Sequence, residues 1–331
     1  MRTVKLGGGG AEITSAGLGC MGMSGGYGPA DDAESVATIH AALEAGVALI
    51  DTGDFYGMGH NEMLIGEALK GKRERAFIAV KFGAMRGPDG AWLGYDLRPA
   101  AVKNFLVYTL RRLKTDYLDL YQPARYDHSV ALEETLGAIA DLRKAGYVRH
   151  IGLSEVSGKT LRRAAANFPI AALQIEYSLA SRGIENEVLP AARALNIPVV
   201  AYGVLSRGLL SEAALSNGAA GGEIRSRMPR FSADNFPRNR ALIDALARLA
   251  KARGATVSQL AFAWIRSRGA DIVPLIGARN RRQLADALAG LQIVLSAEEL
   301  AAIERAMPKD AVAGERYGPA AMKHLDSETS G

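Results

Sequence analysis

Short apolar segments alternate with longer amphipathic segments along most of this chain, and no other feature restricts its fold as strongly. We expect eight strands, at residues 18–20, 47–51, 77–81, 117–121, 148–153, 171–175, 199–202 and 272–275. The segments between them place apolar residues at helical spacing, which predicts helices. Strands that alternate with helices form a parallel sheet, because each helix carries the chain back to the edge where the next strand begins.

Eight strand and helix units predict a closed (β/α)8 TIM barrel, an α/β fold that forms a single domain of about 250 residues or more. An open doubly wound sheet is disfavoured, because the early segment GLGCMGMSGGYG lacks the glycine spacing of a dinucleotide fingerprint. Segments 3–6 and 12–14, with four glycines between them, predict an N-terminal β-hairpin that closes the bottom of the barrel.

Residues 1–310 are expected to form the barrel domain, and residues 311–331 a polar C-terminal extension with little fixed structure. The stretch 203–239 is rich in Gly and Arg and weakly periodic, which is typical of a functional loop. A linker between two domains is the alternative. We disfavour it because it would separate strand 199–202 from its expected partner at 272–275.

Charge and composition exclude several classes of protein. The net charge of +5 comes from Lys and Arg scattered among Asp and Glu, which disfavours nucleic-acid binding, whereas local Arg clusters at 225–240 and 279–282 suit a phosphorylated small molecule. A single cysteine, Cys20, excludes an internal disulfide framework and fits a reducing compartment. No signal-like or membrane-spanning apolar run occurs, so we expect a soluble cytoplasmic protein. Its oligomeric state is not indicated.

Polar residues end the predicted strands, where barrel enzymes carry their functional side chains. They are Asp51, Lys81, Ser154, Gln174 and Tyr202, together with the segment 121–127. The segment DTGDFYG follows the second strand and brings a tyrosine, Tyr56, over the same end of the barrel. We therefore expect these side chains to meet at the mouth.

Tyr56, Lys81 and Asp51 form a chemically coherent group. A tyrosine with a pKa near 10 needs a nearby cation to exchange a proton near neutrality, and Lys81 supplies one that Asp51 can hold. Such a group can deliver a proton to a carbonyl oxygen. Taken singly, each residue fits a structural ion pair or a packed loop aromatic equally well.

Six separated motifs carry a resemblance to a known family. They are DTGDFYG with Asn61 and Glu62, VKFG, IGLSE, LQIEYS, AYGVLSRGLL and VPLIGARNRRQL. In this order they resemble the aldo-keto reductase superfamily, from about Gly17 to Ala289. The resemblance implies NADPH-dependent carbonyl reduction, with Asp51, Tyr56 and Lys81 as catalytic residues.

The resemblance also implies a set of residues that hold NADPH/NADP+: Gly22, Met23, Ser154, Gln174, Tyr202, Gly203, Leu205, Arg207, Gly208, Gly277, Arg279 and Gln283. Ser154 and Gln174 would bind the carboxamide, and Tyr202 would stack on the nicotinamide ring. Arg279 would select NADPH over NADH, because a guanidinium can bind the 2′-phosphate through two parallel hydrogen bonds.

One departure concerns catalysis. The family usually carries a histidine at the end of the fourth strand, where this chain has Ala124. His60 and His128 are the candidates to replace it, although both fit solvated loop side chains better. We hypothesise that Ala124 leaves room for a bulky ketone. Substrate contacts are expected from Ala124, Arg125, Trp92 and Tyr126, and Arg125 fits a partner of a carboxylate equally well. Glu155 and Ala287 stand where many members have asparagine.

The sequence thus predicts an NADPH-dependent reductase of a small aldehyde or ketone, with Tyr56 as proton donor and no metal ion. A regulatory or sensor subunit that binds NADPH with little turnover is the alternative that the missing histidine keeps open. A hydrolase or aldolase with Lys81 as a Schiff base is disfavoured, because Asp51 would raise the pKa of this amine.

Overall fold

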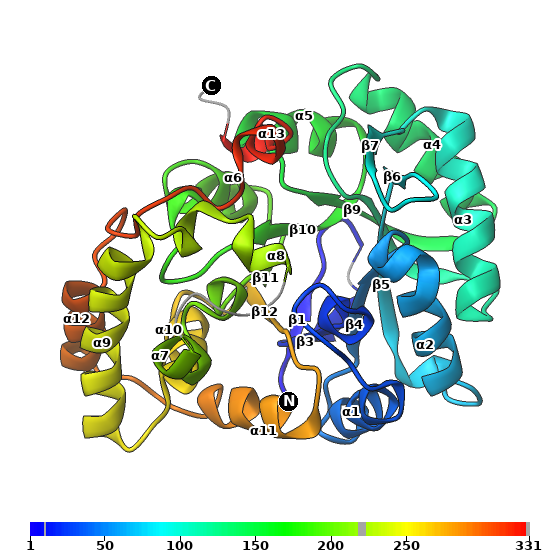
Figure 1. Ribbon diagram of the computed structural model, residues 1–331. Coiled ribbons are helices and arrows are strands. Elements are labelled where there is room, and N and C mark those ends of the chain that lie inside the picture. The colour runs from blue at the N-terminus through cyan, green and yellow to red at the C-terminus, as the bar shows by residue number, and fades with distance from the viewer. Residues whose placement is uncertain (10, 218–222, 329–331) are drawn as a thin grey trace.

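Eight parallel strands close into a barrel in the computed structural model, which describes residues 1–9, 11–217 and 223–328 (Figure 1). The barrel strands are β3 (Gly17–Gly19), β4 (Leu49–Gly53), β5 (Phe77–Phe82), β8 (Leu118–Pro123), β9 (Val148–Ser154), β10 (Ile170–Glu176), β11 (Val199–Tyr202) and β12 (Ile272–Ile276). They neighbour one another in chain order, and β12 pairs with β3 to complete the ring. The predicted TIM-barrel fold is confirmed.

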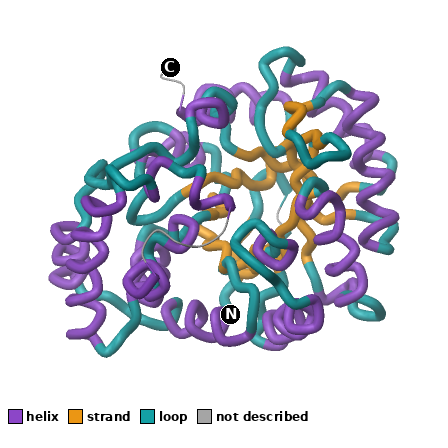
Figure 2. The backbone as a smooth tube through the Cα atoms, in the orientation of Figure 1, coloured by secondary structure: helices purple, strands orange, loops and turns teal. Residues whose placement is uncertain are grey.

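Helices surround the strands on the outside, as Figure 2 shows in purple around orange. The longer ones are α1 (Asp32–Glu44), α2 (His60–Ala68), α3 (Pro99–Leu113), α4 (Leu132–Lys144), α5 (Gly158–Asn167), α6 (Val188–Ala194), α9 (Phe236–Arg253), α10 (Val257–Ser267), α11 (Arg281–Gly290) and α12 (Ala297–Ala306). Side-chain oxygens of Asp31, Ser157, Thr256 and Asn280 cap the starts of α1, α5, α10 and α11, because free backbone N–H groups there need acceptors. Within the described residues, no helix is both long and apolar enough to cross a membrane.

Apolar side chains fill the barrel interior at the end that the N-terminal hairpin covers. Leu49, Leu120 and Val273 belong to a cluster of buried side chains that includes Val4 and Ile13 of the N-terminal hairpin. This hairpin is formed by β1 (Thr3–Lys5) and β2 (Glu12–Thr14), as the sequence predicts. Chemistry inside the barrel is therefore restricted to the other end, where the strands carry polar residues.

Two segments behave differently from the sequence-based expectation. A second hairpin, β6 (Ala84–Arg86) and β7 (Trp92–Tyr95), rises beside the mouth between β5 and α3, where no strand was expected. The C-terminal segment 311–328 was expected to be weakly structured, yet it crosses the barrel mouth and carries a short helix, α13 (Pro319–Met322) (Figure 1). Leu325 is 1% exposed, and Asp326 accepts a hydrogen bond from the backbone N–H of Ser157 at 2.7 Å.

The stretch 203–239 contains four short helical segments before α9. They are η5 (Ser206–Gly208), α7 (Glu212–Asn217), α8 (Glu223–Ser226) and η6 (Pro229–Phe231). Arg230 is buried there and donates to the hydroxyls of Ser181 and Ser206. The described part of this stretch, residues 203–217 and 223–239, thus packs on the barrel end that follows β10 and β11.

Candidate active site

Asp51 and Lys81 form a buried ion pair at the carboxyl ends of β4 and β5. The Lys81 ammonium donates to both carboxylate oxygens of Asp51, at 2.7 and 2.8 Å, and to the carbonyl of Thr52 at 2.9 Å. Gln174 reaches across from β10 and donates its side-chain N–H to Asp51 at 2.6 Å. All three hydrogens of Lys81 are thereby used, which fixes the ammonium beneath the mouth.

Tyr56 lies over this pair in a short 3-10 segment, η2 (Tyr56–Gly59). The Lys81 nitrogen is 5.2 Å from the centre of the Tyr56 ring. Asn61 fixes the loop, because its amide donates to the carbonyl of Cys20 and to the hydroxyl of Ser24, and its oxygen accepts from Thr52. The hydroxyl of Tyr56 has no hydrogen-bond partner within the part of the chain that the structure describes, so it is available to a bound molecule.

The local charges keep Tyr56 protonated. Burial, followed by the carboxylate of Asp51, raises the pKa of Tyr56 well above 10, and the positive charge of Arg125 works in the opposite direction. Burial also lowers the pKa of Lys81, although Asp51 opposes this shift. The sequence analysis expected Lys81 to lower the pKa of Tyr56. In the structure burial and the Asp51 carboxylate raise this pKa instead, and Tyr56 is a neutral phenol that can donate a proton.

The end of β8 carries Ala124 and Arg125. Ala124 is 2% exposed, and its backbone N–H donates to the carbonyl of Phe82 on β5. His60 contacts Ser24 and Asp32, and His128 lies 3.6 Å from Asp326 and beside the ring of Tyr126. Neither histidine bonds to Asp51, Tyr56 or Lys81, so neither of these two imidazoles takes the place that Ala124 leaves.

Three residues expected to contact the nicotinamide lie around the mouth at neighbouring strand ends. The Ser154 hydroxyl on β9 is buried without a hydrogen-bond partner among the described residues, which is costly unless a ligand supplies one. Gln174 is bonded to Asp51, and Tyr202 ends β11 with its hydroxyl donating to Glu155 at 2.7 Å. The side chains therefore surround one space above the ion pair.

The segment expected to hold the pyrophosphate follows β11. Arg207 and Gly208 have positive φ angles, 57° and 90°, and a Cβ at Gly208 would lie 2.4 Å from the Arg225 guanidinium. Gly203 also has a positive φ and lies against Glu176, and Leu205 forms the cap of η5. Glycine permits this tight turn, whose backbone can approach a ligand closely.

The residues expected to hold the adenosine half lie at the start of α11. Arg279 donates to the carbonyls of Tyr27 and Pro29, and its backbone N–H donates to Gln283. Gly22 lies against the Arg279 side chain, whereas Gly277 has open space around it. Met23 is 0% exposed and packs in the core, so its side chain is buried away from the surface. Gly22, which follows β3, and Arg279, which follows β12, therefore lie side by side at the rim of the barrel mouth.

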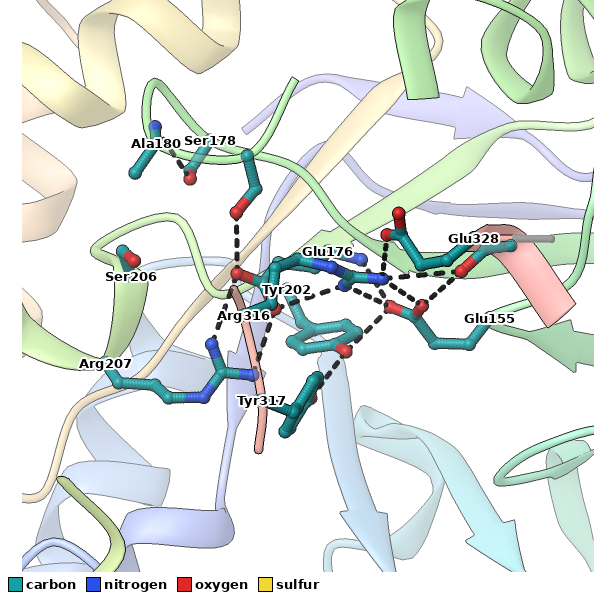
Figure 3. Close-up of polar contacts among 12 residues, drawn as sticks. Glu155, Glu176, Ser178, Ala180, Tyr202, Ser206, Arg207, Arg316, Tyr317 and Glu328 are labelled. Carbon is teal, nitrogen blue, oxygen red and sulfur yellow. Dashed lines mark hydrogen bonds and ion pairs between the residues drawn. The ribbon is translucent and has the colours of Figure 1, made fainter. Parts of the chain in front are cut away.

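A buried charge network that sequence reasoning missed lies next to Tyr202. Arg316 of the C-terminal segment donates to both oxygens of Glu155, at 3.1 and 2.8 Å, and to Glu176 at 3.2 Å (Figure 3). Arg207 donates to the same Glu176 at 3.2 and 2.9 Å. The signal available in the sequence was an acidic residue at the ends of two consecutive strands, but nothing placed Arg316 beside them.

These arginines keep both carboxylates ionised. Burial is the largest single influence and raises the pKa of Glu155, yet Arg316, Arg125 and Tyr202 together hold that pKa well below 4.5. Burial likewise opposes ionisation of Glu176, but Arg207, Arg316 and Arg230 lower its pKa to about 2. Glu155, which stands where many members of the family have asparagine, therefore carries a fixed negative charge.

The expected substrate residues lie in different surroundings. Trp92 is 42% exposed at the tip of the β6–β7 hairpin, where it packs on Arg86 and Tyr95. Tyr126 packs on His128 and interacts with Arg163 of α5, which directs it toward the helix layer. Tyr95, a further aromatic residue that the sequence offered as a pocket wall, lies near Arg125, and so does Tyr317 of the C-terminal segment, which the sequence did not indicate.

Comparisons with known proteins agree with this geometry. A model of the aldo/keto reductase family matches residues 16–307. The chain is 40% identical to the probable aldo-keto reductase 1 of Glycine max over 321 residues, which covers 96% of this chain and 92% of that protein. Among solved structures it is similar to a glycerol dehydrogenase of Gluconobacter oxydans, with a TM-score of 0.82, 29% identity and coverage of 99% and 97% of the two chains. It is also similar to an aldo/keto reductase of Klebsiella pneumoniae in complex with NADP and acetate, with a TM-score of 0.74, 30% identity and coverage of 96% and 99%.

Proposed function

Because the chain belongs to the aldo/keto reductase family, we propose that it reduces an aldehyde or ketone to an alcohol with NADPH. The observation that carries this proposal is the convergence of Tyr56, Lys81 and Asp51 at one barrel mouth, with the phenol hydroxyl free and the ammonium 5.2 Å from its ring. A proton donor held over a buried ion pair suits the protonation of a carbonyl oxygen.

The residues around the mouth fit a dinucleotide. The unpartnered hydroxyl of Ser154 suits a carboxamide, the glycine turn at Gly203 and Gly208 suits a pyrophosphate, and Arg279 beside the N-terminus of α11 suits a phosphate. The Klebsiella pneumoniae structures hold NADP in one case and NADPH in another, which supports the same cofactor here. When bound, NADPH supplies a hydride, which carries two electrons to the carbonyl carbon.

The chain's own residues supply the proton and the orientation. Tyr56 donates its hydroxyl proton to the carbonyl oxygen as negative charge develops there, so that carbonyl compound, hydride and proton give the alcohol. Lys81, held by Asp51, offers a positive charge beside the phenolate that remains. The phenolate then regains a proton from solvent.

Ala124 is proposed to widen the space beside the carbonyl. A methyl group at the end of β8 occupies less volume than an imidazole, and His60 and His128 make their contacts elsewhere. The structure thus favours acceptance of a ketone with a bulky substituent on that side.

The test is NADPH oxidation with a panel of aldehydes and ketones, followed by absorbance at 340 nm. Tyr56→Phe should remove turnover and leave NADPH affinity within a few-fold of the parent, measured by calorimetry, because only the proton donor is lost. Turnover of Tyr56→Phe at the parent rate would refute the assignment. Tight NADPH binding by the parent without turnover of any carbonyl compound would favour a cofactor sensor instead.

A further inference from the structure

Arg125 carries a positive charge at the mouth that the protein balances only in part, because Glu155 acts on it without forming an ion pair. Its guanidinium donates to the carbonyl of Ala124 at 2.6 Å and to the hydroxyl of Tyr317 at 3.4 Å. A guanidinium has five N–H groups, so three remain without a hydrogen bond to the described residues. It also forms no ion pair with any carboxylate that the structure describes.

The other buried cations near the mouth are paired. Lys81 is paired with Asp51, Arg207 with Glu176, and Arg316 with Glu155 and Glu176. The sequence left open whether Arg125 contacts substrate or pairs with a carboxylate of the protein. The described residues do not show the second of these, a carboxylate pair. A half-buried cation without a counter-ion attracts an anion from solution.

A chain of hydrogen bonds orients the donors around Arg125. Tyr202 uses its single hydroxyl hydrogen on Glu155, so Tyr317 donates to Tyr202 across their 2.8 Å contact. Tyr317 is thereby left as an acceptor toward Arg125, and its ring lies 5.8 Å from the Arg125 guanidinium carbon. The chain fixes the phenol ring of Tyr317 beside Arg125 and leaves the remaining N–H groups of this arginine as the donors.

The position of Arg125 in the ring of strands places it beside the reacting groups. It follows β8, which pairs with β5, the strand that carries Lys81. The expected nucleotide contacts follow β11, β12 and β3, which lie on another part of the ring. The charge of Arg125 also acts to lower the pKa values of Tyr56 and Lys81, so the guanidinium lies near both groups.

We propose that Arg125 binds an anionic group of the substrate, so that the preferred substrate is an aldehyde or ketone that also carries a carboxylate or a phosphate. This inference rests on the proposed function, because it assumes that the carbonyl lies at Tyr56. The planar guanidinium matches both anions through two parallel N–H groups. Arg125 is thus a specificity-determining residue at the end of β8.

The experiment compares aromatic aldehydes that differ in one group. The kcat/KM is measured for 4-carboxybenzaldehyde, 4-formylphenyl phosphate and the neutral 4-carbamoylbenzaldehyde, at one pH and ionic strength. Arg125→Met removes the charge, and Arg125→Lys keeps it without the planar fork. Arg98→Met is the matched control, because it removes a positive charge near the mouth from a side chain that is 74% exposed and already paired with Asp96.

We expect the better anionic aldehyde to exceed the amide by roughly 10- to 100-fold in kcat/KM, the range of a charged hydrogen bond. Arg125→Met should abolish this ratio, Arg125→Lys should keep part of it, and Arg98→Met should keep all of it. A ratio near one in the parent, or an unchanged ratio in Arg125→Met, overturns the inference while the proposed reductase activity stands.

Calorimetric binding of the same aldehydes separates the two proposals. If no aldehyde is reduced, the proposed function fails, and the inference is still decided by whether an anionic aldehyde binds at least tenfold more tightly than the amide through Arg125. Equal affinities of the three aldehydes would overturn it on this route as well.

Discussion

Replacing Arg316 by glutamine should lower the free energy of unfolding more at high pH than at low pH. Arg316 is 6% exposed and bridges the buried carboxylates of Glu155 and Glu176 (Figure 3). Removing one partner of a buried ion pair costs about 3–5 kcal/mol, because the remaining charge is left in a poorly solvated place. Breaking this network should therefore cost a similar amount near pH 8.

The pH dependence follows from the pKa of Glu155. In the parent this pKa is held below 4.5, so the carboxylate contributes stability that is present above pH 4.5 and lost as the pH falls through the lowered pKa. Burial is already the largest influence on this pKa, so removing the opposing charge of Arg316 lets the pKa rise. The variant then loses stability as the pH rises above about 4.5, so the difference from the parent is small near pH 5 and largest near pH 8.

Urea unfolding followed by circular dichroism at pH 5 and pH 8 measures this difference. With 331 residues and an unfolding entropy of about 2.1 cal/mol/K per residue, a loss of about 3–5 kcal/mol corresponds to a Tm lower by about 4–7 °C. The double variant Glu155→Gln with Arg316→Gln should recover most of the loss at pH 8, because no isolated carboxylate remains at that position. An equal loss at both pH values, with no recovery in the double variant, would refute the reasoning.

Three further outcomes are expected. Burial raises the pKa of Asp54 from 3.8 to about 8, so this carboxyl destabilises the fold increasingly as the pH rises from about 4 to about 8. Asp54→Asn should therefore raise the Tm by several degrees more at pH 9 than at pH 5, as measured by differential scanning fluorimetry. Ala124→His should lower kcat/KM for bulky aryl ketones about tenfold relative to small aldehydes, and unchanged or faster turnover of bulky ketones would contradict the proposed space beside the carbonyl. Arg279→Gln should reduce the preference for NADPH over NADH by about tenfold or more, because a neutral amide pairs poorly with a 2′-phosphate; the ratio of the two kcat/KM values measures it.

The barrel could be predicted from the sequence, because its strands and helices are specified by residue patterns over a few neighbouring positions. Strand 47–51 was expected and Leu49–Gly53 is observed, and strand 199–202 has the predicted bounds. A run of apolar residues between amphipathic helices specifies a parallel strand wherever it lands in the ring. The rule that strand ends carry the site also located Asp51, Lys81 and Gln174, whose contacts the structure places together.

The parts that sequence reasoning missed depend on contacts between distant residues. Arg316 lies 161 positions from Glu155, and a polar tail gives no local signal that its arginine will be buried. The hairpin that carries Tyr95 has a turn pattern, GPDG at residues 87–90, but its strands are only three and four residues long, which leaves little periodicity to recognise.

By itself, the sequence determined the barrel and the polar residues at the ends of its strands, because periodicity and residue type act over a few neighbours. Only the tertiary structure decided how the charges balance. It showed that Asp51 forms a buried ion pair with Lys81 and that Arg316 of the C-terminal segment pairs with Glu155. It also showed that Arg125 has no carboxylate partner among the described residues. Electrostatic energy depends on distance and burial, and both are set by the folded chain as a whole.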